Sequence, residues 1–220
     1  MRYEIKFPYK NFYNNELLTF LNSTKNIKQN FPKRKITSIY FDDLNLTTAI
    51  ENVQGVLKRR KYRVRFYNDD MNNLFHEIKI KNNSLGIKRI IKTKNNFMDL
   101  NNFFSYQFLN SKFENYLPFF KEVKHHNLKP VCKISYYRNY FLYKNKIRIT
   151  HDHSILYYSL LYKHDNSLNY IKDENEVLEV KFEKENLPIA SEILNKINFQ
   201  NQRYSKYLSC LSNYKIISYF

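Results

Sequence analysis

Five short stretches of the chain alternate charged and apolar residues with a period of two, and most of the charges are basic. Successive side chains of a β-strand point to opposite faces, so each stretch places Lys, Arg and Glu on one face and Ile, Val and Phe on the other. A sheet closed on itself would turn the charged faces inward and form a cationic bore suited to a polyanion. The stretches are residues 2–6, 61–66, 77–81, 146–149 and 178–182.

The net charge of the chain is strongly positive. Its 220 residues contain 37 Lys and Arg against 20 Asp and Glu, a formal charge of +17, which predicts anionic partners such as nucleic acid, a phosphate-rich metabolite or an anionic membrane surface. The two cysteines, Cys132 and Cys210, form no CxxC pair, so we expect reduced, buried thiols. No apolar run approaches the roughly 20 residues that span a bilayer, and no signal-peptide pattern opens the sequence. We therefore expect a cytoplasmic protein.

The order of the elements predicts an α+β fold, with a single domain over residues 1–220. The strand patterns outnumber those of a doubly wound parallel sheet, and regular crossover helices do not separate them. A helical insertion is expected at 94–129, and a last helix near 203–212. We expect strands at 2–7, 36–41, 61–67, 74–81, 86–93, 131–143, 146–151, 154–163 and 176–183, and further helices at 15–21, 46–53 and 188–197.

Cations gather on neighbouring strands of this predicted sheet. Arg63 and Arg65 share one strand face, and two guanidinium groups about 7 Å apart can each bind a phosphate through two hydrogen bonds. A solvated edge strand would explain this pair alone. The next two strands repeat the pattern, however, and like charges on adjacent strands repel by about 1 kcal/mol per pair in water. An anion that neutralises them is the better explanation. The repeated cations are Lys79 and Lys81, beside Glu77, and then Lys88 and Lys92.

A few carboxylates lie among these cations. Glu179 shares its strand face with Lys181, and Glu4 shares one with Lys6. Such carboxylates either bind a divalent ion beside the phosphates or serve only as ion-pair partners, and the pattern does not separate the two. Arg138 and Arg148 extend the cationic theme to a second hairpin.

Several common catalytic and metal-binding patterns are missing from the sequence. The histidines at 125–126 and at 151 and 153 have no further ligands at a typical zinc spacing. The sequence contains no GxxxxGK[ST] loop and no GxSxG elbow, and with two glycines it cannot form a Gly-rich phosphate loop. Any phosphate must therefore be bound by side chains.

In their order and spacing, eight short motifs resemble those of VTC-domain proteins. These are the vacuolar-transporter-chaperone-type polyphosphate polymerase domains of the triphosphate tunnel metalloenzyme superfamily. The resemblance spans nearly the whole chain, apart from about 94–129. The motifs are Arg2-Tyr3-Glu4-Ile5-Lys6-Phe7, Thr37-Ser38-Ile39-Tyr40-Phe41-Asp42, Lys61-Tyr62-Arg63-Val64-Arg65, Glu77-Ile78-Lys79, Tyr137-Arg138, Ile147-Arg148-Ile149-Thr150, Leu178-Glu179-Val180-Lys181 and Arg203-Tyr204-Ser205-Lys206-Tyr207.

The resemblance implies an antiparallel eight-stranded β-barrel or tunnel with flanking helices and a C-terminal helix. It also implies that inward cations bind a triphosphate and that Glu179 holds Mn²⁺ or Mg²⁺, with Glu4 as a second candidate ligand from its strand position. The expected catalytic residues are Arg63, Arg65, Arg138, Arg148 and Lys206, and the expected substrate-binding residues are Lys6, Lys79, Lys81 and Lys88.

The expected activity is transfer of the γ-phosphate of ATP, or of another nucleoside triphosphate, to inorganic polyphosphate. The same set of cations suits a triphosphatase that admits water as the acceptor, or a non-catalytic module that binds a polyanion. Nucleic acid is the less favoured partner because Tyr62 and Phe66 lie on the face opposite Arg63 and Arg65. The membrane segments and the SPX domain of the eukaryotic complex are not recognisable in the sequence, so any membrane association is expected to come through a partner.

Overall fold

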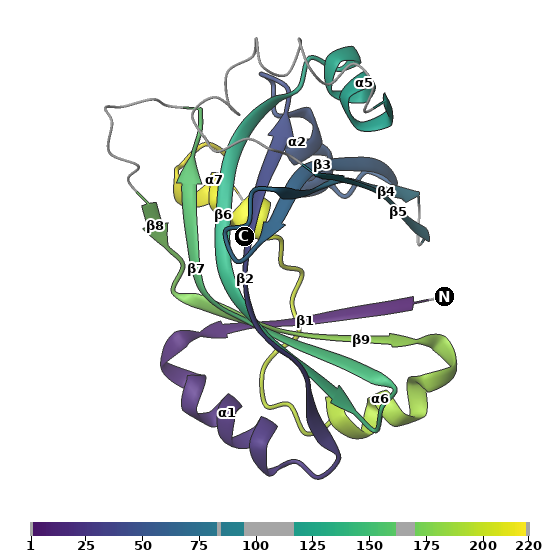
Figure 1. Cartoon of the computed structure of the whole chain (residues 1–220). Coiled ribbons are helices and arrows are strands. Elements are labelled where there is room, and N and C mark those ends of the chain that lie inside the picture. Colours follow the sequence, from purple (N-terminus) through teal and green to yellow (C-terminus); the bar gives the residue numbers. More distant parts are fainter. Residues whose placement is uncertain (1, 83–84, 95–116, 162–169, 219–220) are drawn as a thin grey trace. The chain divides into compact units, whose positions relative to one another are not determined.

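The computed structural model describes residues 2–82, 85–94, 117–161 and 170–218 (Figure 1). The chain divides into two compact units. Unit 1 comprises Met1–Lys35, Ser135–Leu156 and Ile171–Ser205, and unit 2 comprises Ile36–Ile134, Tyr157–Tyr170 and Lys206–Phe220.

The strands form one antiparallel path in the order β1-β9-β7-β6-β2-β3-β4-β5, and the short β8 pairs with β7. With its flanking helices, this arrangement confirms the predicted α+β class. The described path ends at β1 and β5, so the hydrogen bonding does not form the closed ring that the charge pattern suggested. The strands are β1 (Arg2–Lys10), β2 (Ile27–Asp42), β3 (Lys58–Tyr67), β4 (Asn73–Asn82), β5 (Leu85–Lys94), β6 (Lys129–Tyr143), β7 (Ile147–Ser159), β8 (Tyr170–Lys172) and β9 (Asn175–Glu183).

The helices mostly match the predicted positions. They are α1 (Asn14–Ser23), α2 (Thr47–Gln54), α5 (Leu117–His125), α6 (Leu187–Leu194) and α7 (Lys206–Asn213), with 3-10 turns η1 (Asn11–Tyr13) and η2 (Lys184–Asn186). Helix α5 lies within the predicted insertion at 94–129, of which residues 95–116 are outside the described part. None of the helices in the described ranges combines the length and the apolar character needed to cross a bilayer.

Two strands are longer than the alternation predicted. Strand β2 begins at Ile27, whereas the prediction placed its start at residue 36. The alternation missed the first half because that half is exposed and rich in lysine, and therefore has no apolar side to indicate a strand. Strand β7 runs to Ser159 without the break that was predicted before Ser154. Ser154 itself has a positive φ of 52° inside the strand. This residue interrupts the alternation of side chains, but the strand continues through it to Ser159.

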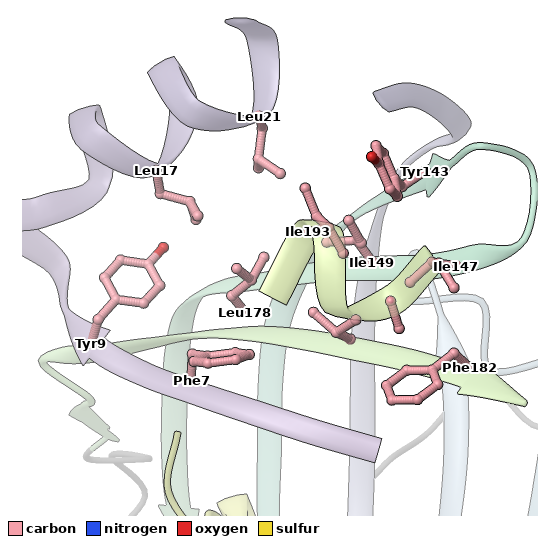
Figure 2. Close-up of a cluster of buried hydrophobic side chains, with 12 residues drawn as sticks. Phe7, Tyr9, Leu17, Leu21, Tyr143, Ile147, Ile149, Leu178, Phe182 and Ile193 are labelled. Carbon is pink, nitrogen blue, oxygen red and sulfur yellow. The ribbon is translucent and has the colours of Figure 1, made fainter. Parts of the chain in front are cut away.

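The core of unit 1 lies between its strands and helices α1 and α6, which cover the same face of β1 and β9 (Figures 1 and 2). The alternation explains why: Phe7 on β1 and Leu178 on β9 are partners in the register and point to this face. The charged residues that alternate with the apolar ones along β1 and β9 therefore lie on the opposite face. The buried residues are Phe7, Tyr9, Leu17, Leu21, Tyr143, Ile147, Ile149, Leu178, Val180, Phe182, Ala190 and Ile193.

The core of unit 2 lies between β2, β3 and β4 on one side and α5 on the other. Phe119 of α5 contacts Phe41 and Tyr62 edge-on, with ring centroids 5.7 and 6.4 Å apart. Because side chains alternate along β3, Arg63 and Arg65 point to the face away from α5. The buried residues are Ile39, Phe41, Tyr62, Val64, Phe66, Leu74, Ile78, Phe119, Val123 and Leu128. The two cysteines are also in unit 2, and both are free and buried, as predicted.

Candidate functional site

Strand register brings four charged residues together on one face of unit 2. Arg63 on β3 is the register partner of both Tyr40 on β2 and Glu77 on β4, and Arg65 is the partner of Ser38. Because directly opposed residues of antiparallel strands share a face, these side chains form one surface. We call Arg63, Arg65, Glu77 and Lys88 the Glu77 cluster.

The carboxylate of Glu77 lies at the centre of this cluster. Arg63 donates through Nε to Oε2 at 2.6 Å, and Lys88 donates through Nζ to Oε1 at 2.7 Å. The side chain of Glu77 is only 3% exposed. Two uncharged oxygens from β2 complete the contacts: Arg63 Nη1 donates to Tyr40 Oη, and Arg65 Nε donates to Ser38 Oγ, both at 3.1 Å.

The Glu77 cluster carries more positive than negative charge. Burial would raise the pKa of Glu77, but the charges of Arg63, Arg65 and Lys88 outweigh it and lower the pKa to about 2. The pKa of Lys88 is also lowered, first by burial and further by repulsion from both arginines, despite its bond to Glu77. The two arginines thus favour the charged form of Glu77 and, together with burial, disfavour the charged form of Lys88. An additional anion would relieve this repulsion.

Two more predicted phosphate ligands lie on the neighbouring part of the same face. Lys79 is exposed on β4 and is the register partner of both Lys61 and Lys88. Lys81 is half-buried and lies opposite Gly86. The structure therefore confirms the strand-to-strand stacking of cations that the sequence predicted in this unit.

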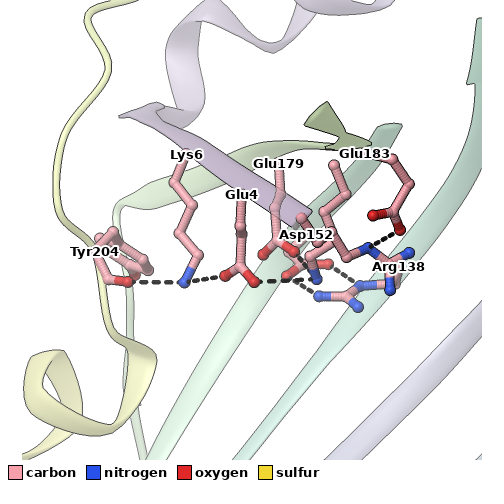
Figure 3. Close-up of polar contacts among 9 residues, drawn as sticks. Glu4, Lys6, Arg138, Asp152, Glu179, Glu183 and Tyr204 are labelled. Atoms are coloured by element: carbon pink, nitrogen blue, oxygen red, sulfur yellow. Dashed lines mark hydrogen bonds and ion pairs between the residues drawn. The ribbon is translucent and has the colours of Figure 1, made fainter. Parts of the chain in front are cut away.

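A second group of charges lies on one face of unit 1 (Figure 3). Lys6 on β1 is opposite Glu179 on β9, and Glu4 is opposite Lys181, so both pairs share a face. Glu4 accepts from Lys6 at 3.1 Å and lies 3.6 Å from Lys181, whose amino group also pairs with Glu179. We call Glu4, Lys6, Arg138, Asp152, Glu179 and Lys181 the Glu179 cluster.

Arg138 is held in this cluster by a two-point ion pair. Its Nε and Nη2 donate to the two carboxylate oxygens of Asp152 at 2.5 and 2.7 Å. Burial would lower the pKa of Arg138, but Asp152 raises it well above its usual range. Burial also opposes ionisation of Glu179, yet Lys181 and Lys6 lower its pKa. The opposite charges of their partners therefore favour the ionised forms of both Arg138 and Glu179.

The Glu179 cluster is suited to a metal ion only in part. Glu4 and Glu179 converge on Lys181, and carboxylate oxygens are the ligands that Mg²⁺ and Mn²⁺ prefer. Oε1 of Glu179 is buried, and it is the oxygen that pairs with Lys181. The described residues contain no group of three His, Cys, Asp or Glu side chains placed to hold a metal. Two carboxylates fit the common Mg²⁺ arrangement in which phosphate oxygens and waters supply the remaining ligands.

Arg148 and Lys206 are the last two predicted residues, and they lie in different units. Arg148 on β7 is exposed and is the register partner of Lys181, so it shares the face of the Glu179 cluster. Lys206 is the first residue of α7 and is half-buried. Tyr204 precedes the helix, and its carbonyl oxygen accepts from Lys6 Nζ at 3.0 Å. Tyr207, Leu208 and Leu211 of this helix are buried.

Four residues with central contacts were not among the predicted site residues. The charge pattern places Glu77 on a cationic strand face without a role, and it assigns no role to Asp152. Ser38 and Tyr40 occur only as part of a motif. Each contacts an arginine that was predicted. For Tyr40 and Ser38 the available signal was their alternation on β2, which matches that of the two arginines on β3.

Comparisons with known proteins agree with this arrangement of strands. The model of the VTC domain family matches residues 2–214. Among solved structures, the PH1819 protein of Pyrococcus horikoshii OT3 is similar, with a TM-score of 0.50, 15% identity, and coverage of 96% of this chain and 99% of the other. A "putative adenylate cyclase" of Bacillus halodurans has a TM-score of 0.52, 12% identity and coverage of 92% of both chains. A comparison with curated proteins found no match.

Proposed function

Because the chain belongs to the VTC domain family, we propose that it transfers the γ-phosphate of a nucleoside triphosphate to inorganic polyphosphate. In this reaction the bond between the γ-phosphorus and the β–γ bridging oxygen breaks, and a bond forms to the terminal oxygen of the polyphosphate chain. The products are a nucleoside diphosphate and a polyphosphate longer by one phosphate.

The excess of cations in the Glu77 cluster carries this proposal. Three cations converge on one buried carboxylate, and Lys79 and Lys81 continue the positive surface along β4. Phosphoryl transfer requires mainly positioning and neutralisation of charge, with little covalent chemistry from the protein. Arg63 and Arg65 would bind phosphate oxygens, and Lys88 would exchange its contact with Glu77 for one with the ligand.

The Glu179 cluster, within unit 1, is the candidate metal site for the proposed reaction. Glu179 and Glu4 would hold Mn²⁺ or Mg²⁺, and the metal would neutralise charge on the phosphate oxygens it binds. Arg138, fixed by Asp152, would present a second guanidinium to a phosphate. Lys6 and Lys181 would keep Glu179 ionised until the metal arrives. Arg148 and Lys206 are proposed to contact the polyphosphate chain.

The test is incubation of the pure protein with ATP and Mn²⁺, with products resolved on gels and by ³¹P spectroscopy. Long-chain polyphosphate is the expected product. Orthophosphate as the only phosphate product would replace the polymerase with a triphosphatase. Binding of polyphosphate without turnover of ATP would indicate a binding module. Arg65→Ala should abolish product formation, whereas Arg89→Ala should not, because Arg89 opposes Ile78 on the other face of β5.

Metal binding provides a test that does not depend on turnover. Two carboxylates without further protein ligands should bind Mn²⁺ weakly, and tripolyphosphate should increase the affinity by supplying oxygen ligands. Electron paramagnetic resonance measures free Mn²⁺ directly in both conditions. Equal Mn²⁺ affinity with and without tripolyphosphate would contradict a site at which the metal and the phosphate bind together. Unchanged Mn²⁺ affinity in Glu179→Gln would contradict it as well.

Lys206 is best tested by substitution, because removing the C-terminal helix would also remove the buried Tyr207, Leu208 and Leu211. Lys206→Met keeps an unbranched side chain that is one atom shorter and removes its charge. If Lys206 binds the growing chain, this change should shorten the polyphosphate products at unchanged consumption of ATP. Products of normal length would exclude Lys206 from the site.

A further inference from the structure

Tyr207 ties the C-terminal helix α7 to β2. Tyr207 is 1% exposed, and its hydroxyl donates to Asp42 Oδ2 at 2.6 Å. Its ring stacks on that of Tyr40, with centroids 5.0 Å apart and an interplanar angle of 8°. Tyr207 therefore contacts both Asp42, the last residue of β2, and Tyr40, two positions earlier. All three residues belong to unit 2.

Asp42 provides a rigid anchor for this contact. Its Oδ1 accepts from the backbone N–H groups of Asp43 and Thr48, each at 3.0 Å. Its Oδ2 accepts from Thr48 Oγ1 at 2.7 Å, from the N–H of Ala49 at 3.0 Å and from Tyr207. The carboxylate thus accepts hydrogen bonds from N–H groups that have no partner within the helix at the start of α2. It is itself fully buried. Five donors leave it little freedom to move.

Tyr40 connects this anchor to the Glu77 cluster. Its hydroxyl accepts from Arg63 Nη1 at 3.1 Å, and the guanidinium carbon of Arg63 lies 5.9 Å from the centroid of its ring. The opposite side of the guanidinium is oriented by Glu77 through Nε. A neutral acceptor such as a tyrosine hydroxyl orients a guanidinium without cancelling its charge, so the charge stays available to an anion.

We propose that Tyr40 is a positioning residue for Arg63, and that Tyr207 of α7 holds Tyr40 in place by stacking on it. The C-terminal helix therefore supports the proposed phosphate-binding surface through two stacked aromatic rings. The orientation of Arg63 follows from contacts within unit 2, whereas its consequence for triphosphate binding rests on the proposed function.

Preorganisation is the physical gain. An arginine side chain loses rotamer freedom when it binds a ligand, and a residue that already restricts it reduces that loss. Tyr40→Phe removes only the acceptor hydroxyl and keeps the stacked ring. Tyr207→Leu removes the stacking and the bond to Asp42, whereas Tyr207→Phe removes that bond alone. The three variants therefore distinguish the effect of the Tyr40 hydroxyl from the effect of the contacts by which Tyr207 holds the Tyr40 ring.

The first measurement uses the free protein and needs no ligand. The ¹⁵Nε–H signal of Arg63, assigned by its loss in Arg63→Lys, reports rotation of the guanidinium and exchange of its protons. Both should be slow in the unaltered protein and faster in Tyr40→Phe and Tyr207→Leu, with Tyr207→Phe in between. Tyr214→Phe is the matched control, because it removes a tyrosine hydroxyl bond to the carbonyl oxygen of Tyr157. An unchanged Arg63 signal in Tyr40→Phe would overturn the proposal.

The second measurement is calorimetric binding of tripolyphosphate. Loss of one orienting hydrogen bond should weaken binding about threefold to tenfold in Tyr40→Phe. In an Arg63→Ala background the same change should have no effect, because there is no guanidinium left to position. Equal weakening in both backgrounds would mean a general structural role and would refute positioning.

The two measurements separate this proposal from the proposed function. If the unaltered protein binds no tripolyphosphate, the proposed function fails, and the Arg63 signal still decides the positioning role. If Tyr207→Leu does not fold, Tyr40→Phe and Tyr207→Phe decide it, since both keep the stacked rings.

Discussion

Replacing Glu77 with glutamine should make the protein less stable and a better phosphate binder. The carboxylate lies between Arg63 and Lys88 at 2.6 and 2.7 Å and is almost fully buried. Its pKa is lowered to about 2 from 4.5, which corresponds to about 3 kcal/mol in favour of the charged form. The Lys88 side chain is 40% exposed, so solvent screening reduces this to about 2–3 kcal/mol.

The pH dependence of this loss has a defined direction. Because the folded pKa of Glu77 is lowered, its contribution to the free energy of unfolding is fully present above pH 4.5 and is lost as the pH falls towards about 2. Glutamine never carries the charge. The difference between the two proteins in urea unfolding should therefore be about 2–3 kcal/mol at pH 7 and should shrink below pH 4.5.

Affinity should change in the opposite direction. Without the carboxylate, the three cations of the Glu77 cluster are no longer partly neutralised, and tripolyphosphate should bind about fivefold to thirtyfold more tightly, since one nearby charge is worth about 1–2 kcal/mol at this distance. Glu183→Gln is the control, because Glu183 pairs with Arg2 at 3.7 Å and both side chains are 49% exposed. The control should change stability by less than about 0.5 kcal/mol. If Glu77→Gln keeps its stability at pH 7 and binds tripolyphosphate no more tightly, the reasoning is wrong.

Three further predictions follow from single side chains. Glu179→Gln should abolish Mn²⁺-dependent turnover but preserve or strengthen metal-free binding of tripolyphosphate, because it removes one negative charge among Lys6 and Lys181; full activity across a Mn²⁺ titration would exclude Glu179 as the ligand. Arg65→Ala should weaken tripolyphosphate binding by about 1.5–3 kcal/mol in calorimetry, the usual loss for a charged hydrogen bond, and unchanged affinity would remove Arg65 from the site. Burial lowers the pKa of His76 to about 4, so the protein should lose stability as the pH falls from about 6.5 towards 4; His76→Leu should flatten that part of the urea unfolding profile, and an identical slope would refute it.

Much of the fold could be predicted because its pattern is local. The period-two alternation identified the strands and the face of each cation, as at Arg63, Arg65 and Lys79, and it depends only on the geometry of an extended backbone. It failed where the backbone was extended without an apolar side. The first half of β2 is this case. In β7 the alternation failed for another reason, because the positive φ at Ser154 interrupts the extended backbone within the strand.

The amino-acid sequence by itself determined which residues are charged, on which strand face each lies and that the surface is cationic. Only the tertiary structure decided which charges are partners. Arg63 and Glu77 are joined by the register of two strands, and Tyr207 reaches Asp42 across 165 positions of sequence. Such pairings depend on strand register and on the docking of a helix, and both result from the packing of the whole core, which no local alternation encodes.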